Sequence, residues 1–298
     1  MNPFFNRWRY LIVVITLSVS SLVCAPLAAA SSEGETSYRE LAAAQLAMEK
    51  KNGRLFFSEK VADGDNKALS GAVKIIQDNG YIEATYRQGF INGVFKQVKK
   101  GKTAFLIEYC DGRPCGDYKQ YYADGKLAKH KQYNKWNQLE GDFKVYSKDD
   151  GRIVRKTRYR QGKKNGFEVL YFEQGLEGVK SRSEFLNDQK HGQETYYYQE
   201  GGVELRQLYQ NGELDGRHIK FAADGKKSFE ANYKDNQLHG SVWMYLEGEV
   251  WILKHYQNGK LHGKWIEYDL EKKGVTKQIK YFENDQEIAQ QGWSKTNG

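Results

Sequence analysis

The chain has 298 residues and a formal net charge of +8, from 46 basic and 38 acidic side chains. Beyond residue 30, no stretch approaches the ~20 apolar residues that a membrane-spanning helix needs. The basic excess is spread along the chain, whereas a nucleic-acid reader carries a basic stripe and a binder of anionic lipid carries a dense basic block. Composition therefore argues against a nucleic-acid partner and does not favour a membrane partner.

Residues 1–30 have the layout of a cleaved secretory signal peptide. A basic start with Arg7 and Arg9 precedes an apolar run over residues 11–23, and a small-residue stretch ends at Ala30. The apolar run is too short for a membrane anchor. We predict cleavage after Ala30 and export, to the periplasm or else to the cell exterior or the outer membrane. Lipidation of Cys24 is the alternative, which the preceding residues 21–23 do not favour.

Residues 31–55 are predicted to form a helical cap. Ser37 and Glu40 have the spacing of a capping box, the body over residues 37–52 is rich in alanine, and Gly53 follows its end. We expect this short helix to cover the open first edge of a following sheet, because uncovered sheet edges invite aggregation.

A unit of 23 to 26 residues repeats over residues 56–292, leaving a tail at 293–298. Each unit begins at an aromatic residue, and in the clearest copies glycines follow three and seven positions later. These lead aromatics are Tyr86, Tyr109, Tyr133, Tyr159, Phe185, Tyr209, Tyr233 and Tyr256. A period in this range predicts a repeat array.

Each unit carries the alternating pattern of two strands joined by tight turns. The turn signals between the two strands are Asn79-Gly80, Asp124-Gly125, Asp150-Gly151, Gln174-Gly175, Gly201-Gly202 and Asp224-Gly225. Such dipeptides adopt the positive φ angles that short hairpin turns require. The segment after each lead aromatic makes the second reversal. We therefore predict an all-β fold in which repeated β-hairpins form one antiparallel sheet.

One position sets the register of the predicted sheet, namely the residue five after the second glycine. It is aromatic in successive units, as Tyr121, Tyr146, Tyr171, Tyr197, Phe221, Tyr245 and Tyr268. Equivalent positions of successive hairpins point to one face. The rings are therefore expected to form a ladder along the sheet, with Val169, Thr195, Ile219, Trp243 and Ile266 on the same face.

This unit resembles the MORN repeat, in particular the bacterial variant found in proteins described as antitoxin components of toxin–antitoxin systems. The motif Tyr-x-x-Gly-x-x-x-Gly is intact at Tyr86, Tyr109, Tyr159, Tyr209 and Tyr256. In three other units Trp136, Asp188 and Asn236 replace the first glycine. The resemblance implies an elongated, twisted sheet of hairpins. It implies less about activity, because a fold serves many functions.

Cys110 and Cys115 bracket a tight turn, and in an oxidising compartment this arrangement predicts a local disulfide. A metal clip would need more ligands than the pair supplies. A thiol redox site would normally have the spacing Cys-x-x-Cys. The disulfide is therefore the favoured interpretation.

No catalytic, metal or cofactor site is predicted. His191, His239 and His262 occupy one repeat position, but equivalent residues of neighbouring hairpins lie about 9 to 10 Å apart, too far to share a metal. Nucleophile, metalloprotease and phosphate-loop motifs do not occur in the sequence. A pair of catalytic carboxylates, as in a glycosidase, would need a pocket that a single-layer sheet does not provide. A carbohydrate-active enzyme is accordingly the weakest of three hypotheses.

Recognition of another molecule is the function that the array favours, because repeat sheets present extended surfaces. Candidate partner-binding residues are Tyr196, Tyr198, Trp243, Trp251 and Trp265, since tyrosine and tryptophan are enriched at binding hot spots. The same residues are also good strand formers. We predict a non-catalytic, exported protein that binds a protein partner in the cell envelope, such as a toxin that it neutralises. The alternative is a structural envelope protein that contacts lipid headgroups or cell-wall glycan.

Overall fold

The computed structural model describes residues 36–62, 64–173, 177–272 and 274–289. The predicted signal peptide, the tail at 293–298 and the Gln174-Gly175 turn lie outside these residues. The described chain is almost entirely β, and none of its helices has the length and apolar character needed to cross a membrane. It divides into two compact units, residues 1–113 and 114–298, which are described separately.

The predicted N-terminal helix is wrong. The segment instead forms strand β1 (Arg39–Ala42), a 3-10 turn η1 (Ala43–Gln45) and strand β2 (Leu46–Lys51). Asn52 and Gly53 have φ angles of 51° and 76° and form the hairpin turn to the next strand rather than a helix end. Helix propensity amounts to less than about 1 kcal/mol per residue, so strand pairing and the burial of Leu41 outweigh it. The edge is still covered, because β1 pairs in parallel with β5.

The first unit combines two sheets. Strands β5 (Gly71–Gln77), β6 (Gly80–Arg87), β7 (Phe90–Lys99) and β8 (Lys102–Cys110) form an antiparallel meander, and β2, β3 (Arg54–Glu59) and β4 (Lys67–Ala68) form a small second sheet. The Phe57 N–H donates to the Gly89 carbonyl at 2.7 Å, which ties the small sheet to the turn between β6 and β7. The apolar core of this unit includes Leu69, Val73 and Tyr86, all at most 2% exposed.

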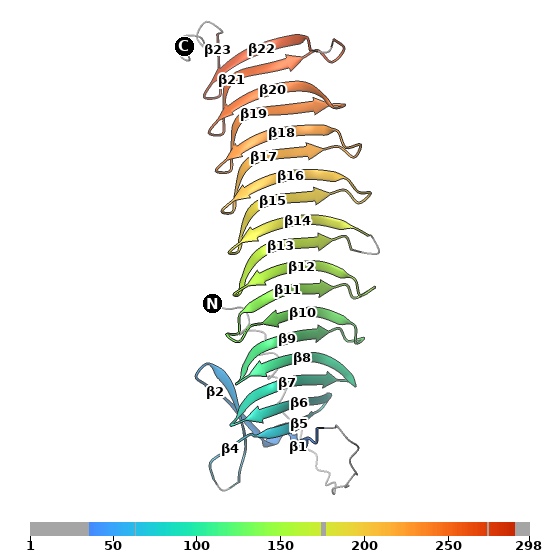
Figure 1. The fold of residues 1–298 in the computed structure, drawn as a ribbon, viewed down its shortest axis with the longest axis vertical. Coiled ribbons are helices and arrows are strands. Elements are labelled where there is room, and N and C mark those ends of the chain that lie inside the picture. Colours follow the sequence, from blue (N-terminus) through green and yellow to red (C-terminus); the bar gives the residue numbers. More distant parts are fainter. Residues whose placement is uncertain (1–35, 63, 174–176, 273, 290–298) are drawn as a thin grey trace. The chain divides into compact units, whose positions relative to one another are not determined.

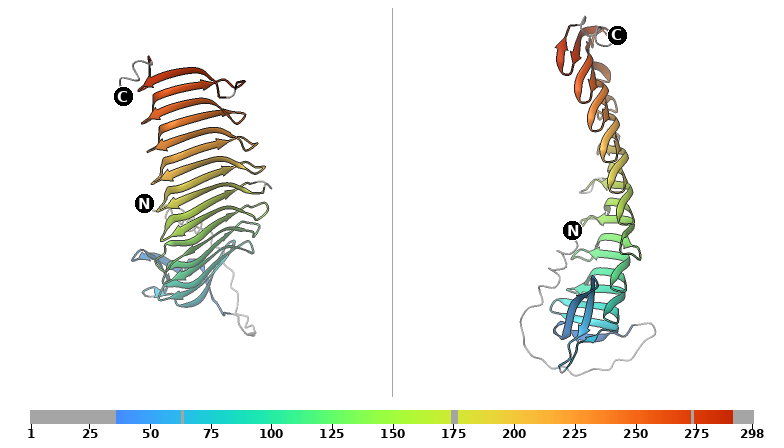
Figure 2. Two further views of the ribbon diagram at one scale, coloured as in Figure 1. Left: turned by 45° about the horizontal axis from the view of Figure 1, so that its top comes forward. Right: turned by 90° about the vertical axis from the view of Figure 1, so that its left-hand side faces the viewer.

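The second unit is a single layer of antiparallel strands that follow one another in chain order (Figure 1). The strands are β9 (Arg113–Tyr121), β10 (Leu127–Tyr133), β11 (Leu139–Tyr146), β12 (Ile153–Arg160), β13 (Lys163–Tyr171), β14 (Val179–Leu186), β15 (Gln189–Tyr197), β16 (Val203–Gln210), β17 (Glu213–Phe221), β18 (Lys227–Lys234), β19 (Gln237–Leu246), β20 (Glu249–Gln257), β21 (Lys260–Tyr268), β22 (Thr276–Glu283) and β23 (Gln286–Ile288). Figure 2 shows the twist of this layer. The predicted meander of hairpins is confirmed.

The reversals that follow the lead aromatics are two-residue turns in the left-handed region. In the intact motif this pair ends in glycine, as in Asn211 (φ 51°) and Gly212 (φ 90°). Where the glycine is replaced, asparagine or aspartate takes its place, as in Asn187 and Asp188 with φ angles of 51° and 72°. Short polar side chains tolerate this conformation best after glycine. The units with Asp188 and Asn236 therefore keep the same turn, whereas the unit with Trp136 has a longer turn between Tyr133 and Leu139 in which only Asn137 (φ 62°) is left-handed.

In most motifs the second glycine lies directly opposite the lead aromatic of the next unit, as Gly216 does opposite Tyr233. Gly216 has a φ of 108°, and the register between β16 and β17 shifts beside it, between Gln207 and Tyr209. A Cβ atom on Gly216 would lie 3.0 Å from Leu208 Cδ1. The glycine is therefore required both by the backbone angle and by the neighbouring side chain.

Cys110 and Cys115 form a disulfide, as predicted. The bond closes a small loop over Asp111 and Gly112, whose φ angles of 47° and 75° mark another left-handed turn. A loop of this size limits the unfolded chain only modestly, and the stabilisation expected from it is about 2 kcal/mol.

Candidate functional site

The two faces of the second unit differ in composition, and the strand register defines each of them. The ladder face carries the predicted ring ladder and one cross-strand row beside it. The row consists of Lys119, His130, Lys144, Lys156, Val169, Arg182, Thr195, Arg206, Ile219, Glu230, Trp243, Leu253, Ile266 and Ile279. The prediction that Val169, Thr195, Ile219, Trp243 and Ile266 share a face is thus confirmed.

The opposite face, called here the lead face, carries the lead aromatics of this unit. Its central row includes Thr157, Glu168, Ser183, Glu194, Gln207 and His218, each directly opposite the next. Several of these polar side chains are buried, among them Thr157, Ser183, Glu194 and Gln207. Buried polar groups are costly unless they are hydrogen-bonded, so the partners of these groups determine whether the lead face is available for binding.

Glu194 is the centre of the largest network on the lead face. It accepts hydrogen bonds from Ser183 Oγ at 2.6 Å and Gln207 Nε2 at 2.7 Å, and it pairs with Lys190 Nζ at 2.7 Å. Burial by itself would raise the pKa of Glu194, but these hydrogen bonds and the Lys190 charge bring the pKa below its ordinary value. The carboxylate is ionised and fully engaged by its neighbours, which indicates a structural role.

The same arrangement recurs one hairpin earlier. Glu168 accepts from Thr157 Oγ1 at 2.8 Å and pairs with Lys164 Nζ at 2.9 Å, and Lys164 lies 4.6 Å from the centre of the Phe185 ring. A lysine, a glutamate and the lead aromatic of the next unit thus form a repeated cluster. This cluster takes the place of a second layer of structure in covering the lead face.

Lys131 shows how far burial on the lead face extends. Its ammonium lies 4.4 Å from the ring centre of Tyr118 and 5.2 Å from that of Tyr133, and the residue is 7% exposed. Burial, followed by the charge of Lys129, lowers the pKa of Lys131 to about 8. We therefore interpret Lys131 as part of the interior of the lead face and not as a binding residue, because the surrounding rings leave its ammonium little access to a partner.

The ladder face is more open. Phe167, Leu208 and Ile279 lie on it and are 41%, 37% and 46% exposed, and Trp251, which is 39% exposed, is the extra residue at the register shift between β19 and β20. The other large apolar side chains with high exposure in the described part of this unit lie in or beside turns, namely Trp136, Leu186, Leu246, Leu270 and Val275. Contiguous exposed apolar patches mark interaction surfaces, whereas Phe167, Leu208 and Ile279 are dispersed over β13, β16 and β22.

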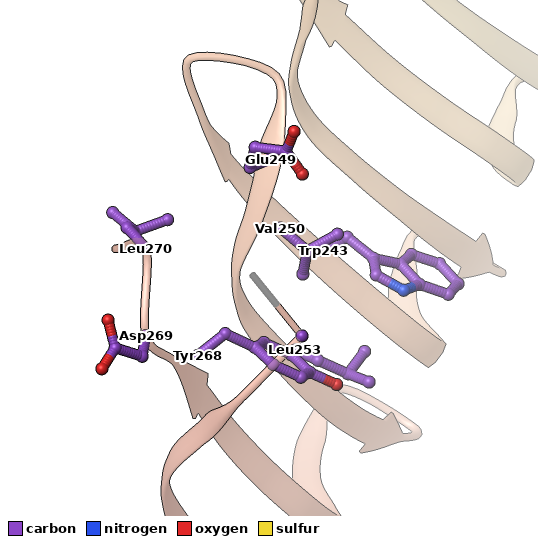
Figure 3. Close-up of a pocket in the computed structure, with 8 residues that line it drawn as sticks. Trp243, Glu249, Val250, Leu253, Tyr268, Asp269 and Leu270 are labelled. Atoms are coloured by element: carbon purple, nitrogen blue, oxygen red, sulfur yellow. The ribbon is translucent and has the colours of Figure 1, made fainter. Parts of the chain in front are cut away.

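The ladder face is hollowed at its C-terminal end, where Trp243, Leu253 and Tyr268 surround a cavity of about 290 Å³ (Figure 3). Val250 adds to the apolar wall, and Glu249 lies at the margin. The remaining lining residues, Asp269, Leu270 and Gly274, come from the loop after β21. The hollow has a mostly apolar wall with carboxylates at its edge, which is the composition of a site that accepts part of a ligand or partner.

The five predicted partner-binding residues do not form one patch. Trp243 lies on the ladder face, whereas Tyr196 and Trp265 lie on the lead face, and Trp251 is the unpaired residue at the register shift between β19 and β20. Tyr198 lies at the end of the β15–β16 hairpin, where its hydroxyl donates to the Phe221 carbonyl at 2.7 Å. Six strand spacings of ~4.8 Å separate Tyr196 from Trp265. Of the five, the structure therefore places Trp243 on the ladder face at the hollow.

Sequence reasoning missed the wall of the hollow beyond Trp243. The sequence pattern indicates only that Leu253 and Val250 belong to a strand and that Tyr268 belongs to the ladder. Their spacing along the chain gives no sign that they surround one cavity. The signal that was available is the ladder itself, which places Tyr268 on the face of Trp243.

The histidines at one repeat position do not assemble a metal site. Among the residues that the structure describes, no three histidine, cysteine, aspartate or glutamate side chains lie close enough together to hold a metal ion. His218 is a separate case on the lead face, where burial, followed by the charge of Lys220, lowers its pKa. Its ring packs edge-on against Phe229 at 5.7 Å, which is the environment of a core histidine.

Neither models of protein families nor curated proteins match this chain. The fold and the site on their own define an all-β hairpin-repeat protein with one covered face and one open face.

Proposed function

We propose that this protein is a non-catalytic, MORN-type repeat protein that binds a protein partner through the ladder face of its second unit. The observation that carries this proposal is the difference between the two faces. Lead aromatics and a central row of mostly buried side chains occupy the lead face, whereas the ladder face, apart from its buried network at Glu230, has exposed Phe167 and Leu208 and the hollow beside Trp243. A partner that covers these apolar groups would gain the free energy of their burial.

The setting that we propose is the cell envelope. The signal-peptide layout of residues 1–30 supports export, and the disulfide between Cys110 and Cys115 agrees with an oxidising compartment. The particular role that the resemblance to bacterial MORN variants favours is that of an antitoxin or immunity component, in which the partner is a toxin neutralised by binding.

The test is affinity capture with residues 31–298 from an envelope extract of the source organism, with retained proteins identified by mass spectrometry. Trp243→Ile serves as the ladder-face variant, because Ile219 and Ile266 hold the same row in neighbouring hairpins. Trp265→Ile is its matched control on the lead face. A stoichiometric protein that is retained by the native chain and the control, but lost with Trp243→Ile, would support the proposal.

The same preparation tests the alternative role, that of a structural envelope protein. Co-sedimentation with liposomes and with peptidoglycan detects contact with lipid headgroups or cell-wall glycan, and an electrostatic contact would weaken at high salt. Retention of lipid or wall fragments without any protein would contradict the proposal in favour of a structural envelope protein. A partner that is toxic when expressed alone, and harmless together with this chain, would support the antitoxin role.

A further inference from the structure

Basic side chains that are scattered along the sequence lie side by side on the ladder face. Lys119, His130, Lys144 and Lys156 are direct cross-strand neighbours on β9 to β12, and the same row continues to Arg182 on β14 and Arg206 on β16. Directly opposed residues are about 4.5 to 5.5 Å apart. The row from Lys144 to Arg206 therefore extends over about 24 Å, or five strand spacings.

Only part of this charge is neutralised within the protein. Asp117 pairs with Lys119 and His130, both at 3.2 Å. Asp142 pairs with Lys156 at 3.0 Å and Arg158 at 3.1 Å. These two carboxylates compensate the start of the row.

Three cations of the row form no ion pair with another described residue. Lys144, Arg182 and Arg206 form no ion pair in the part of the chain that the structure describes, and Arg182 and Arg206 are exposed. Glu184, which lies on the same face, forms no ion pair with them. Lys144 lies directly opposite Lys156, and like charges in directly opposed positions destabilise a sheet. The arrangement costs stability in the free protein, and an anionic partner would relieve that cost.

Arg182 is already positioned for such a contact. Its guanidinium stacks on the Phe167 ring with 3.7 Å between the guanidinium carbon and the ring centre. A stacked guanidinium loses little further freedom on binding and matches a carboxylate with two parallel hydrogen bonds. The ladder hydroxyls of Tyr146 and Tyr171 lie two residues along the strands from this row and add further hydrogen-bonding groups.

We infer that the row binds an extended acidic segment of the protein partner, whose carboxylates meet Lys144, Arg182 and Arg206. This inference rests on the proposed function, since it specifies the chemistry of the partner at the proposed face. Side chains on one side of an extended segment recur about every 6.8 Å, a spacing that allows several of them to reach the row at once. A polynucleotide fits less well, because its dense charge, one per about 3.4 Å of strand, would also meet Asp117, Asp142 and Glu184.

The test compares two triple variants of residues 31–298 that lose the same charge. The row variant is Lys144→Gln, Arg182→Gln and Arg206→Gln, and the control is Arg155→Gln, Lys220→Gln and Lys254→Gln on the lead face. Titration calorimetry measures binding of poly-L-glutamate, of single-stranded poly-dT and of heparin at low and moderate salt. We expect poly-L-glutamate to bind, and the row variant to bind it about tenfold more weakly, because each exposed ion pair contributes about a factor of two. The control should change affinity by less than about twofold.

Three results would overturn the inference: no binding of poly-L-glutamate, equal losses in the two variants, or binding of poly-dT or heparin in its place. Capture with the row variant distinguishes this failure from failure of the proposed function. A partner that binds the row variant as tightly as the native chain would agree with the proposed function and would contradict the inference that the row binds an acidic segment. If poly-L-glutamate binds the native chain more tightly than the row variant but no protein is captured, the row binds acidic chains and the proposed function fails.

Discussion

Lys144 on β11 lies directly opposite Lys156 on β12, so that two lysines are direct cross-strand neighbours on the ladder face. Asp142 pairs with Lys156 but not with Lys144. A strand pair selected for stability alone would place opposite charges here, because such a pair contributes roughly 0.2 to 1 kcal/mol and like charges oppose folding. The juxtaposition identifies a position at which stability and binding place different demands on the sequence.

Lys144→Glu is expected to stabilise the fold by about 0.5 kcal/mol, since it places a carboxylate between His130 and Lys156. Urea unfolding followed by circular dichroism measures the change in the free energy of unfolding. The control is Lys220→Glu on the lead face, where the opposite residues are Leu205 and Phe229 rather than cations. An equal gain in the control, or a loss of stability in Lys144→Glu, would show that the lysine pair is not under strain.

Gly216→Ala should destabilise the protein more than Gly225→Ala. Both glycines have positive φ angles, 108° and 81°, which cost an alanine about 1 to 2 kcal/mol. Only the Cβ atom at 216 would also approach Leu208 Cδ1 to 3.0 Å, whereas nothing lies within 4 Å of the one at 225. We expect an additional loss of about 1 kcal/mol at Gly216. Chemical unfolding of the two variants measures the difference, and equal losses would mean that Leu208 moves aside without cost.

Tyr86→Phe should stabilise the first unit. The Tyr86 side chain is buried, and its hydroxyl has no hydrogen-bond partner among the described residues. Removing a buried, unsatisfied polar atom is expected to raise the free energy of unfolding by about 1 kcal/mol. Tyr122→Phe is the matched control, because the Tyr122 hydroxyl donates to the Tyr146 carbonyl at 2.7 Å and its loss should lower stability. Thermal unfolding of both variants shows whether the signs differ as expected.

Lys131 should make stability depend on pH in the alkaline range. Its pKa falls from 10.5 to about 8 on folding, because burial disfavours the ammonium. Between pH 8 and 10.5 the unfolded chain therefore binds more protons than the folded chain, and stability rises with pH. The gain over the whole window is about 3 kcal/mol. It should disappear in Lys131→Met.

The measurement for Lys131 is the difference in unfolding free energy between native protein and Lys131→Met at several pH values from 7 to 10.5. Buried tyrosines such as Tyr133 have raised pKa values and reduce stability above pH 10, but this contribution is present in both proteins and cancels. A difference that stays constant with pH would show that the surrounding rings stabilise the ammonium as well as water does.

Local chemistry made most of the fold predictable. Left-handed turns need glycine, asparagine or aspartate, and these residues mark the hairpins even where Asp188 or Asn236 replaces the glycine. The ladder was predictable because equal spacing in the repeat becomes equal position in the sheet. The helix at residues 37–52 was mispredicted because the pairing of β1 with β5 and of β2 with β3 depends on residues up to about 35 positions away, and such pairing outweighs local propensity.

The period, most of the turns and the face on which the ladder rings lie follow from interactions within one or two hairpins, so the sequence was enough to predict them. Which charges become neighbours depends on the pairing of successive strands. Lys144, Arg182 and Arg206 are far apart in the sequence, where they are part of a basic excess that is spread along the chain. Only the register, set by the glycine-containing shifts between successive strands, places them in one row on the open face. The side chains around the hollow at Trp243 were brought together in the same way, since neighbours across strands are not neighbours in sequence.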